Sequence, residues 1–336
     1  MAGQTLGALG VTRAALLPMG ADPFLNAYWL RHYSQVWAGE VDELRILMCG
    51  QADPEVIEAI RRQAAQVPHA VFEVDPNRVV HGEAIGRLIA RTSADHVMLC
   101  EDDAFVRRPG IVDRHFRRIE SGETDIVGCP RGNTNPKIVD AAIQKWGSWE
   151  TTESGEVGHS LWPCFLFTRT ANLRATDGHY DSRNWAPGDV IAGLGYTVDE
   201  YSSGDTFVSA SYQLRAMGLR IALESEFRME EAKLGQWDHI PWFHVGSLSS
   251  GYGSHFPGVM PEPVYRERVA VIRSETEIGD WYKRVSFWRR VWQNGAGAQH
   301  AAYGQALAQF MADIEIDPER LARWDAGFDR LITWTE

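Results

Sequence analysis

The 336 residues of this chain are enough for one large domain or two smaller ones. Hydrophobic residues make up 44% and charged residues 23%, a balance that excludes a largely disordered chain. The formal net charge of −12 gives no broad attraction to phosphate backbones, so we expect no nucleic-acid partner. The sequence has no signal-peptide pattern and no apolar run of membrane-span length, which predicts a cytoplasmic protein without a transmembrane segment.

Strand and helix patterns alternate along the first hundred residues. The expected strands are 5–17, 43–49, 70–74 and 96–100, and the expected helices are 22–37, 55–66 and 82–92. Such alternation predicts an α/β fold with a mostly parallel central sheet flanked by helices. Ligands of these sheets bind beyond the carboxyl ends of the strands.

The second half of the chain has a less regular pattern. The expected strands are 125–129, 162–168, 219–223 and 240–245, the expected helix is 206–217, and 131–160 is expected to be a variable loop. Residues 261–336 show helical patterns without a repeated strand signal. We therefore expect a main domain at 1–260 and a helical C-terminal extension at 261–336.

Three consecutive acids, Glu101, Asp102 and Asp103, follow the apolar run 96–100. Carboxylates at the edge of a core are costly unless positive charge neutralises them, and a divalent cation supplies such charge. Magnesium and manganese take carboxylate oxygens and commonly bridge to phosphate oxygens. The position after a buried strand favours a metal site over the alternative, a solvated acidic turn.

The segment from Gly82 to Asp103, a helix, an apolar strand and an acidic triplet, resembles the donor site of family 2-type GT-A glycosyltransferases. Residues 195–200, the sequence 204–206 and the helix after it are similar to the acceptor-side block of these enzymes. His244 then falls where many of them have a metal-binding histidine. The match covers roughly residues 8–250, and the order of its blocks is more specific than an acidic triplet alone.

The resemblance implies a GT-A (Rossmann-like) fold in which residues 1–105 bind the donor nucleotide and 106–260 bind the acceptor. Under its Glu-Asp-Asp version of the motif, Asp103 binds Mn²⁺ or Mg²⁺, Glu101 faces the donor ribose and Asp102 lies near the donor sugar. The implied partners are a UDP- or GDP-sugar donor and a carbohydrate or other hydroxyl acceptor.

Asp205 is the candidate catalytic residue. Where enzymes of this fold invert the anomeric centre, the matching aspartate is the general base that takes the proton from the acceptor hydroxyl. Asp is also a favoured N-cap residue, so Asp205 can instead cap a helix that begins near Thr206. The two roles are compatible.

His244 is the second candidate metal ligand. It lies between Phe243 and Val245 in an apolar segment, where a histidine is more often a hydrogen-bonded core residue. The acidic triplet upstream favours a neutral imidazole ligand. His239 and His255 are alternatives nearby.

Further candidates are expected at the two ends of the substrate site. The donor base and ribose would lie over the ends of the first strands, which points to Thr12, Arg13, Gln51 and Arg78. An acceptor platform is expected from aromatic rings, which stack on the apolar faces of sugars, and the candidates are Trp162, Trp185 and Tyr201. With 13 tryptophans in the chain, core packing is the alternative for these rings.

Residues 281–292 place Trp281, Val285, Trp288 and Trp292 on one helical stripe beside basic residues. Such a helix can touch a membrane surface, which would place the protein at the inner face of the membrane. More often, an apolar stripe packs on its own domain or on a second subunit, which allows a homo-oligomer through the C-terminal helices.

These expectations predict a metal-dependent glycosyltransferase that works with inversion. A nucleotidyltransferase also pairs an α/β sheet with carboxylates and a metal, but it would have a glycine-rich basic loop, and residues 10–13 match one poorly. The non-enzymatic alternative is a glycan-binding or scaffold protein of the same fold without turnover.

Overall fold

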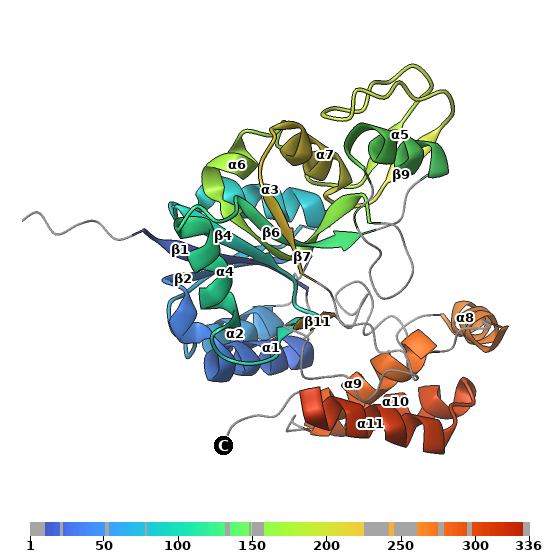
Figure 1. The fold of residues 1–336 in the computed structure, drawn as a ribbon. Helices are drawn as coiled ribbons and strands as arrows, with labels where there is room; N and C mark the ends of the chain where they lie inside the picture. Colours follow the sequence, from blue (N-terminus) through green and yellow to red (C-terminus); the bar gives the residue numbers. More distant parts are fainter. Residues whose placement is uncertain are drawn as a thin grey trace, which may run out of the picture.

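The computed structural model describes residues 11–20, 23–50, 54–77, 79–131, 135–147, 149, 158–224, 242–244, 261–274, 279–293 and 298–331. Within these ranges a seven-stranded sheet forms the centre of the molecule (Figure 1). Its order is β10-β6-β7-β4-β1-β2-β3, and β7 alone among these strands is antiparallel to its neighbours. The predicted α/β fold with a mostly parallel sheet is confirmed.

The strands of this sheet are β1 (Arg13–Met19), β2 (Glu43–Cys49), β3 (Ala70–Asp75), β4 (His96–Cys100), β6 (Ile126–Arg131), β7 (Ser160–Arg169) and β10 (Ile221–Leu223). Successive residues of a strand point to opposite faces, so the apolar run of β1 is shared between two cores. Ala15, Leu17 and Met19 join one buried cluster, and Ala14 and Leu16 join the other. Both faces of β1 are therefore buried, as its continuous apolar sequence requires.

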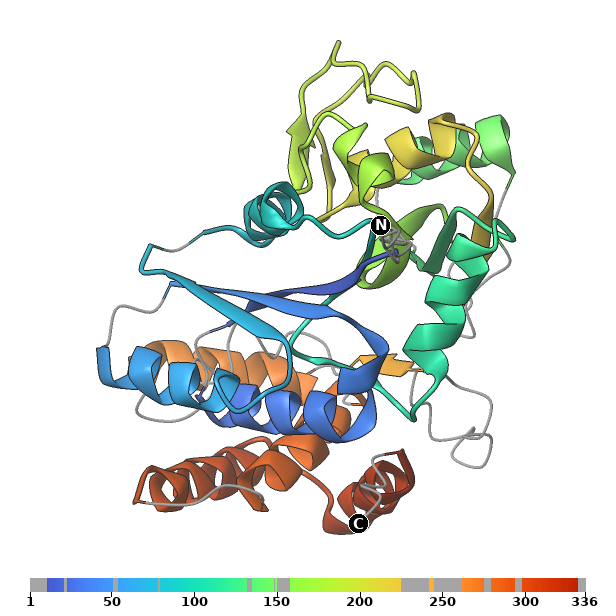
Figure 2. The same cartoon turned by 90° about the vertical axis from the view of Figure 1, so that its left-hand side faces the viewer.

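Helices cover both faces of the sheet (Figure 2). The first cluster packs under α1 (Pro23–Val36), α2 (Pro54–Ala64) and α4 (Ile111–Glu120), and the second packs under α3 (His81–Arg91), α6 (Thr170–Arg174) and α7 (Val208–Ala216). A third, smaller cluster lies between α7, α5 (Pro136–Trp146) and β8 (Arg183–Trp185). β8 pairs with β9 (Ser202–Gly204), and β5 (Ala104–Val106) pairs with β11 (Trp242–His244).

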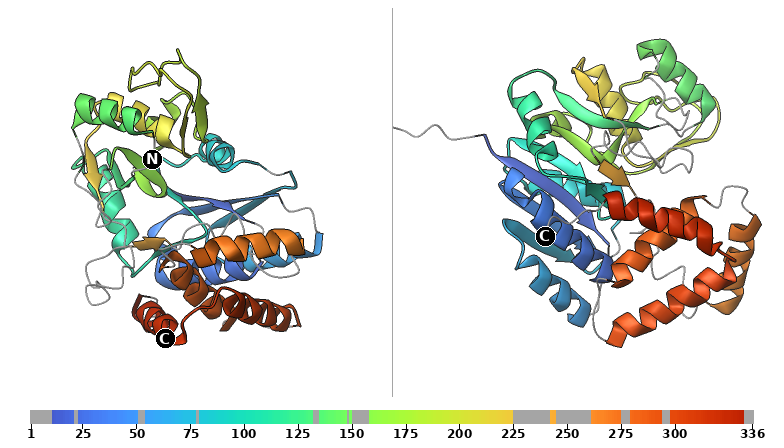
Figure 3. Two further views of the ribbon diagram at one scale, coloured as in Figure 1. Left: turned by 90° about the vertical axis from the view of Figure 1, so that its right-hand side faces the viewer. Right: turned by 60° about the horizontal axis from the view of Figure 1, so that its bottom comes forward.

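The C-terminal helices are α8 (Glu262–Ser274), α9 (Gly279–Gln293), α10 (Ala298–Asp313) and α11 (Pro318–Leu331). They lie on the side of the sheet that α1 and α2 cover, and α9 contacts α1 (Figure 3). Trp281, Val285 and Trp288 are buried in the first cluster of the chain itself. The predicted stripe therefore packs on its own domain, and the interpretation as a membrane-contacting surface is wrong for these three side chains.

Two expected elements differ from the structure. The first strand begins at Arg13 and ends at Met19, later than the expected 5–17, and residues 1–10 lie outside the described part. The expected loop at 131–160 contains α5, which begins with Asn135 as N-cap and Pro136 in its first turn. Asn and Pro in sequence also signal a turn, and here they start a helix.

None of the helices in the described ranges combines the length and the apolar character needed to cross a membrane.

Candidate functional site

The acidic triplet lies at the carboxyl end of β4, directly after Cys100. Asp102 and Asp103 are each only 1% exposed. The backbone N–H of Gly20, which follows β1, donates a hydrogen bond of 2.7 Å to Asp102 Oδ2. Asp102 therefore ties the carboxyl ends of β4 and β1 together, at the edge of the sheet where ligands of such folds bind.

Asp103 immediately precedes β5, and β5 pairs with β11 in antiparallel register. His244 lies opposite Ala104 in this pairing. The backbone of His244 is therefore next to the residue that follows Asp103, although 140 residues separate them in the chain. The side chain of His244 lies outside the described part of the structure, as do all atoms of His239 and His255.

The carboxylates at the end of β4 have the chemistry of ligands for a divalent cation. Among the described residues, no group of three or more His, Cys, Asp or Glu side chains is arranged to hold a metal. The smaller set at the end of β4 consists of two buried carboxylates, and the register brings the His244 backbone beside it. Carboxylate oxygens suit Mn²⁺ or Mg²⁺, and a cation would offset the cost of burying these charges.

Glu101 has a histidine neighbour that the sequence analysis did not select. His81 Nε2, in the first residue of α3, lies 3.5 Å from Glu101 Oε1. The Glu101 side chain is 13% exposed, so it lies at the border between the core and the edge of the sheet. The helix predicted at 82–92 begins one residue after His81, whereas α3 includes His81 as its first residue.

Asp75 and Arg87 form a second polar pair at this edge. Asp75 ends β3, opposite Cys49 of β2, and it forms an ion pair with Arg87 on α3. The backbone N–H of Asn77 and the Arg87 guanidinium hold the pKa of Asp75 below its ordinary value. This acid is the last residue of the third strand, at the carboxyl edge of the sheet.

Asp205 follows β9 and forms an ion pair with Arg131, which ends β6. Arg131 Nη2 lies 2.7 Å from Asp205 Oδ2, and the backbone N–H of Thr206 donates to Asp205 Oδ1 at 2.8 Å. Helix α7 begins at Val208, and its N-cap is Phe207 at a φ of 71°. Asp205 is therefore not the N-cap of this helix, contrary to the alternative role.

Trp162 lies between the two acidic sites. β7 pairs with β4 through Phe165 and Cys100, and it pairs with β6 through Trp162 and Cys129. Trp162 is thus three residues beyond the end of the β4 pairing, on the side of the acidic triplet. The Arg131 guanidinium carbon lies 4.1 Å from the centre of the Trp162 ring. The structure brings Glu101, Asp102, Asp103, Trp162 and Asp205 to one edge of the sheet.

The other two aromatic candidates have different surroundings. Trp185 is 2% exposed and belongs to the cluster beneath α5 and α7, so its ring is a core side chain and the prediction of an acceptor platform is wrong for it. A Cβ atom on Gly204 would lie 2.5 Å from this ring. Tyr201 is 82% exposed, one residue before β9, and remains a candidate for acceptor contact.

Thr12 and Arg13 lie at the opposite edge of the sheet. Thr12 precedes β1, where its backbone N–H and its hydroxyl donate to Asp95 Oδ2 at 3.0 and 3.1 Å. Arg13 forms ion pairs with Asp113 and Glu120 at 2.8 and 2.6 Å. The donor role predicted for them is wrong, because both lie at the amino end of β1, away from the edge where ligands of such sheets bind. Gln51 and Arg78 lie outside the described residues.

No family model matches the sequence, and no curated protein matches it. Solved structures with a similar fold include the mannosyltransferase PcManGT from Pyrobaculum calidifontis with GDP-Man and Mn²⁺ (TM-score 0.43, 12% identity, covering 95% of this chain and 74% of that one). They also include S. aureus TarS with UDP-GlcNAc (0.40, 12%, covering 96% and 82%). A third is glucosyl-3-phosphoglycerate synthase from Mycobacterium tuberculosis with Mn²⁺, UDP and phosphoglyceric acid (0.35, 22%, covering 58% and 68%). At identities below 25% and TM-scores below 0.5, these likenesses carry no argument about function, which rests on the site itself.

Proposed function

We propose that the chain is a metal-dependent glycosyltransferase that moves a sugar from a nucleoside-diphosphate donor to an acceptor hydroxyl with inversion. The observation that carries the proposal is that two acidic sites lie at the same edge of the sheet. The buried acids after β4 and the exposed acid after β9 lie at this edge with Trp162 between them. One acidic site fits a metal and a diphosphate, and the other has the exposure that a base needs to reach a hydroxyl.

In this proposal each acid has its own role. Asp103, with His244, would hold Mn²⁺ or Mg²⁺, which would supply positive charge beside the leaving diphosphate. Glu101 faces the donor ribose, and Asp102 keeps the ends of β1 and β4 together beside the donor sugar. The donor therefore lies over the half of the sheet formed by residues 1–105.

Asp205 acts on the acceptor from the half formed by residues 106–260. Its carboxylate takes the proton of the acceptor hydroxyl as that oxygen attacks the anomeric carbon. The bond from this carbon to the diphosphate oxygen breaks in the same displacement, and the electron pair leaves with the nucleoside diphosphate. Tyr201, which is exposed near Asp205 in the chain, is the aromatic ring proposed to contact the acceptor.

The deciding experiment is a thermal-shift screen of nucleoside diphosphates and nucleotide sugars with and without Mn²⁺, on wild type and Asp103→Ala. The proposal expects one nucleotide to raise the melting temperature only with Mn²⁺, and it expects this rise to be absent in the variant. No response to any nucleotide would instead favour a glycan-binding or scaffold protein. Stabilisation by a nucleoside triphosphate but by no diphosphate sugar would favour a nucleotidyltransferase.

A further inference from the structure

The carboxylate of Asp205 is fixed at both oxygens. Oδ1 accepts the backbone N–H of Thr206 at 2.8 Å, and Oδ2 lies 2.7 Å from Arg131 Nη2. A carboxylate oxygen can accept two hydrogen bonds, so the contacts among the described residues leave each oxygen one position for a further donor. The contacts therefore set the plane of the carboxylate and leave it able to accept an acceptor hydroxyl.

Arg131 is in turn fixed from two sides. Its backbone carbonyl, at the end of β6, accepts the His159 N–H at 3.1 Å and the Ser160 hydroxyl at 3.3 Å. Its guanidinium lies over the Trp162 ring, 4.1 Å from the centroid. A planar cation on an aromatic face is attracted by the ring quadrupole and loses the freedom to rotate away. The Arg131 side chain is 22% exposed, compared with 38% for Asp205.

We propose that Arg131, stacked on Trp162, is the positioning residue that orients Asp205 toward the acceptor. The inference rests on the proposed role of Asp205 as the base. It also gives Trp162 a function different from the one expected for it. One face of this ring holds the guanidinium, so Trp162 supports the base instead of stacking on a sugar with that face.

The chemistry of this contact requires arginine. Lysine preserves the charge, but its ammonium group is a point charge on a flexible stem and does not stack as a plane. A carboxylate that rotates away from the acceptor hydroxyl loses reaction rate, because a displacement of about 1 Å at a reacting group can cost 100-fold. Arg131→Lys should thus keep the ion pair and still lower the rate.

The test measures release of nucleoside diphosphate from the nucleotide sugar that stabilises the wild type, with water as the acceptor. We expect kcat to fall at least about 100-fold in Asp205→Asn and about 10- to 100-fold in Arg131→Ala, with an unchanged KM for the donor. In Arg131→Lys and in Trp162→Leu, kcat should fall by a smaller factor. Millimolar guanidinium should restore part of the rate of Arg131→Ala, and sodium at the same ionic strength should not.

Arg169→Gln is the matched control. Arg169 is also an arginine paired with an aspartate, Asp125, but it lies at the opposite end of β7 from Trp162. Loss of the Arg169 charge should leave kcat within about twofold of wild type, because an ion pair at the surface and far from the site contributes little. A rate of Arg131→Ala equal to that of this control would overturn the inference.

Failure of the proposed function gives a different result. If wild type binds no nucleotide and releases none, the glycosyltransferase proposal fails, and crystal structures of wild type and Arg131→Ala then decide the orienting role. The inference expects the Asp205 carboxylate to turn away or to adopt several conformers in the variant. An unchanged carboxylate would overturn the inference.

Discussion

Phe287 of α9 packs against Phe105 of β5, with their ring centroids 5.2 Å apart. Phe105 is two positions after Asp103, so a C-terminal helix supports the segment that carries the proposed metal ligand. Tyr28 of α1 contacts both rings, at 5.9 and 5.4 Å. The C-terminal helices are therefore part of the core behind the candidate site.

Truncation of this contact should affect stability and metal-dependent binding together. Phe287 is fully buried, so Phe287→Ala should lower the free energy of unfolding by about 3–5 kcal/mol, as large-to-small core changes do. We also expect a smaller Mn²⁺-dependent rise in melting temperature with the nucleotide. Urea unfolding and the thermal-shift screen measure the two effects. Val271→Ala is the control, because Val271 is 52% exposed on α8 and should change stability by less than about 0.5 kcal/mol.

Gly82 should not tolerate a methyl group. A Cβ atom at this position of α3 would lie 2.2 Å from the backbone of Asp181, and a backbone cannot move aside as a flexible side chain can. Gly82→Ala should therefore lower the free energy of unfolding by about 1–3 kcal/mol, despite the higher helix propensity of alanine. A chemical-denaturation curve measures this change.

Gly39→Ala is the matched substitution for Gly82→Ala. Nothing lies within 4 Å of a Cβ atom at Gly39, so the stability of this variant should equal or exceed that of wild type. Equal losses in the two glycine variants would show that the close approach of α3 to Asp181 has no energetic importance.

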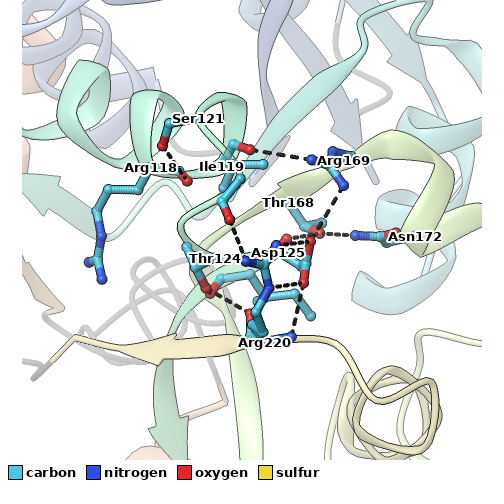
Figure 4. A network of polar contacts seen from close by, with 11 residues as sticks. Arg118, Ile119, Ser121, Thr124, Asp125, Thr168, Arg169, Asn172 and Arg220 are labelled. Carbon is cyan, nitrogen blue, oxygen red and sulfur yellow. Dashed lines mark hydrogen bonds and ion pairs between the residues drawn. The ribbon is translucent and has the colours of Figure 1, made fainter.

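Asp125 is the centre of a polar network at the amino edge of the sheet (Figure 4). It accepts hydrogen bonds of 3.0 Å from both the backbone N–H and the Nε of Arg220, and Arg169 lies 3.4 Å away. These contacts, Arg220 first, lower the pKa of Asp125. Asp125→Asn should reduce the free energy of unfolding at pH 7 by about 1–3 kcal/mol, because charged hydrogen bonds in a largely buried site are lost.

The effect of Asp125→Asn should depend on pH in a defined direction. A carboxyl group with a lowered pKa stabilises the fold above its ordinary pKa of 3.8, and this contribution disappears as the pH falls through its folded pKa. The stability difference between wild type and variant should therefore shrink in acid. A constant difference from pH 7 down to the acid transition would argue against the ion pairs as its source.

Buried histidines should make the protein lose stability in mild acid. Burial lowers the pKa of His32 to about 4 from an ordinary 6.5, and it lowers those of His115 and His159 to about 3 and about 4. A neutral buried histidine stabilises the fold above the ordinary pKa, and the contribution is lost as the pH falls from 6.5 toward 4. At about 1.4 kcal/mol per pKa unit, His32 alone accounts for about 3 kcal/mol of this loss.

Substitution of His32 by phenylalanine should reduce the steepness of this acid-dependent loss. The ring of His32 packs edge-on against Phe105, and an aromatic side chain preserves that contact. The measured quantity is the slope of the unfolding free energy against pH between 6.5 and 4. A slope identical to that of wild type would show that His32 does not titrate on unfolding in this range.

The sequence predicted the sheet well where strands are short, apolar and bounded by turns. The expected strands at 43–49 and 96–100 have the bounds found in β2 and β4. β4 is buried at every residue, and β2 ends in the continuous apolar run 46–49, so both stand out as short apolar segments. The first strand begins eight residues later than expected, and Thr12 and Arg13 therefore lie at its amino end.

The sequence predicts the acidic residues of the candidate site, but it does not predict which residues lie next to them. The position of Glu101–Asp103 follows from the strand before it, which is a local signal. The contact of Arg131 with Asp205 joins residues that are far apart in the chain, and no local pattern predicts such a pair. The same holds for His81 beside Glu101 and for the register of His244 opposite Ala104.

The antiparallel strand β7 has a consequence for synthesis of the chain. β3, β2, β1 and β4 all belong to the first hundred residues, but the other edge of β4 pairs with β7, which emerges from the ribosome much later. Until then, β4 presents the unpaired backbone groups of an edge strand, a known template for aggregation. A nascent chain that ends shortly after β4 thus carries its acidic triplet on an unprotected strand. Chaperone binding during this interval would protect the incomplete chain, and the pairing with β7 would complete the sheet and bring the two parts of the candidate site together.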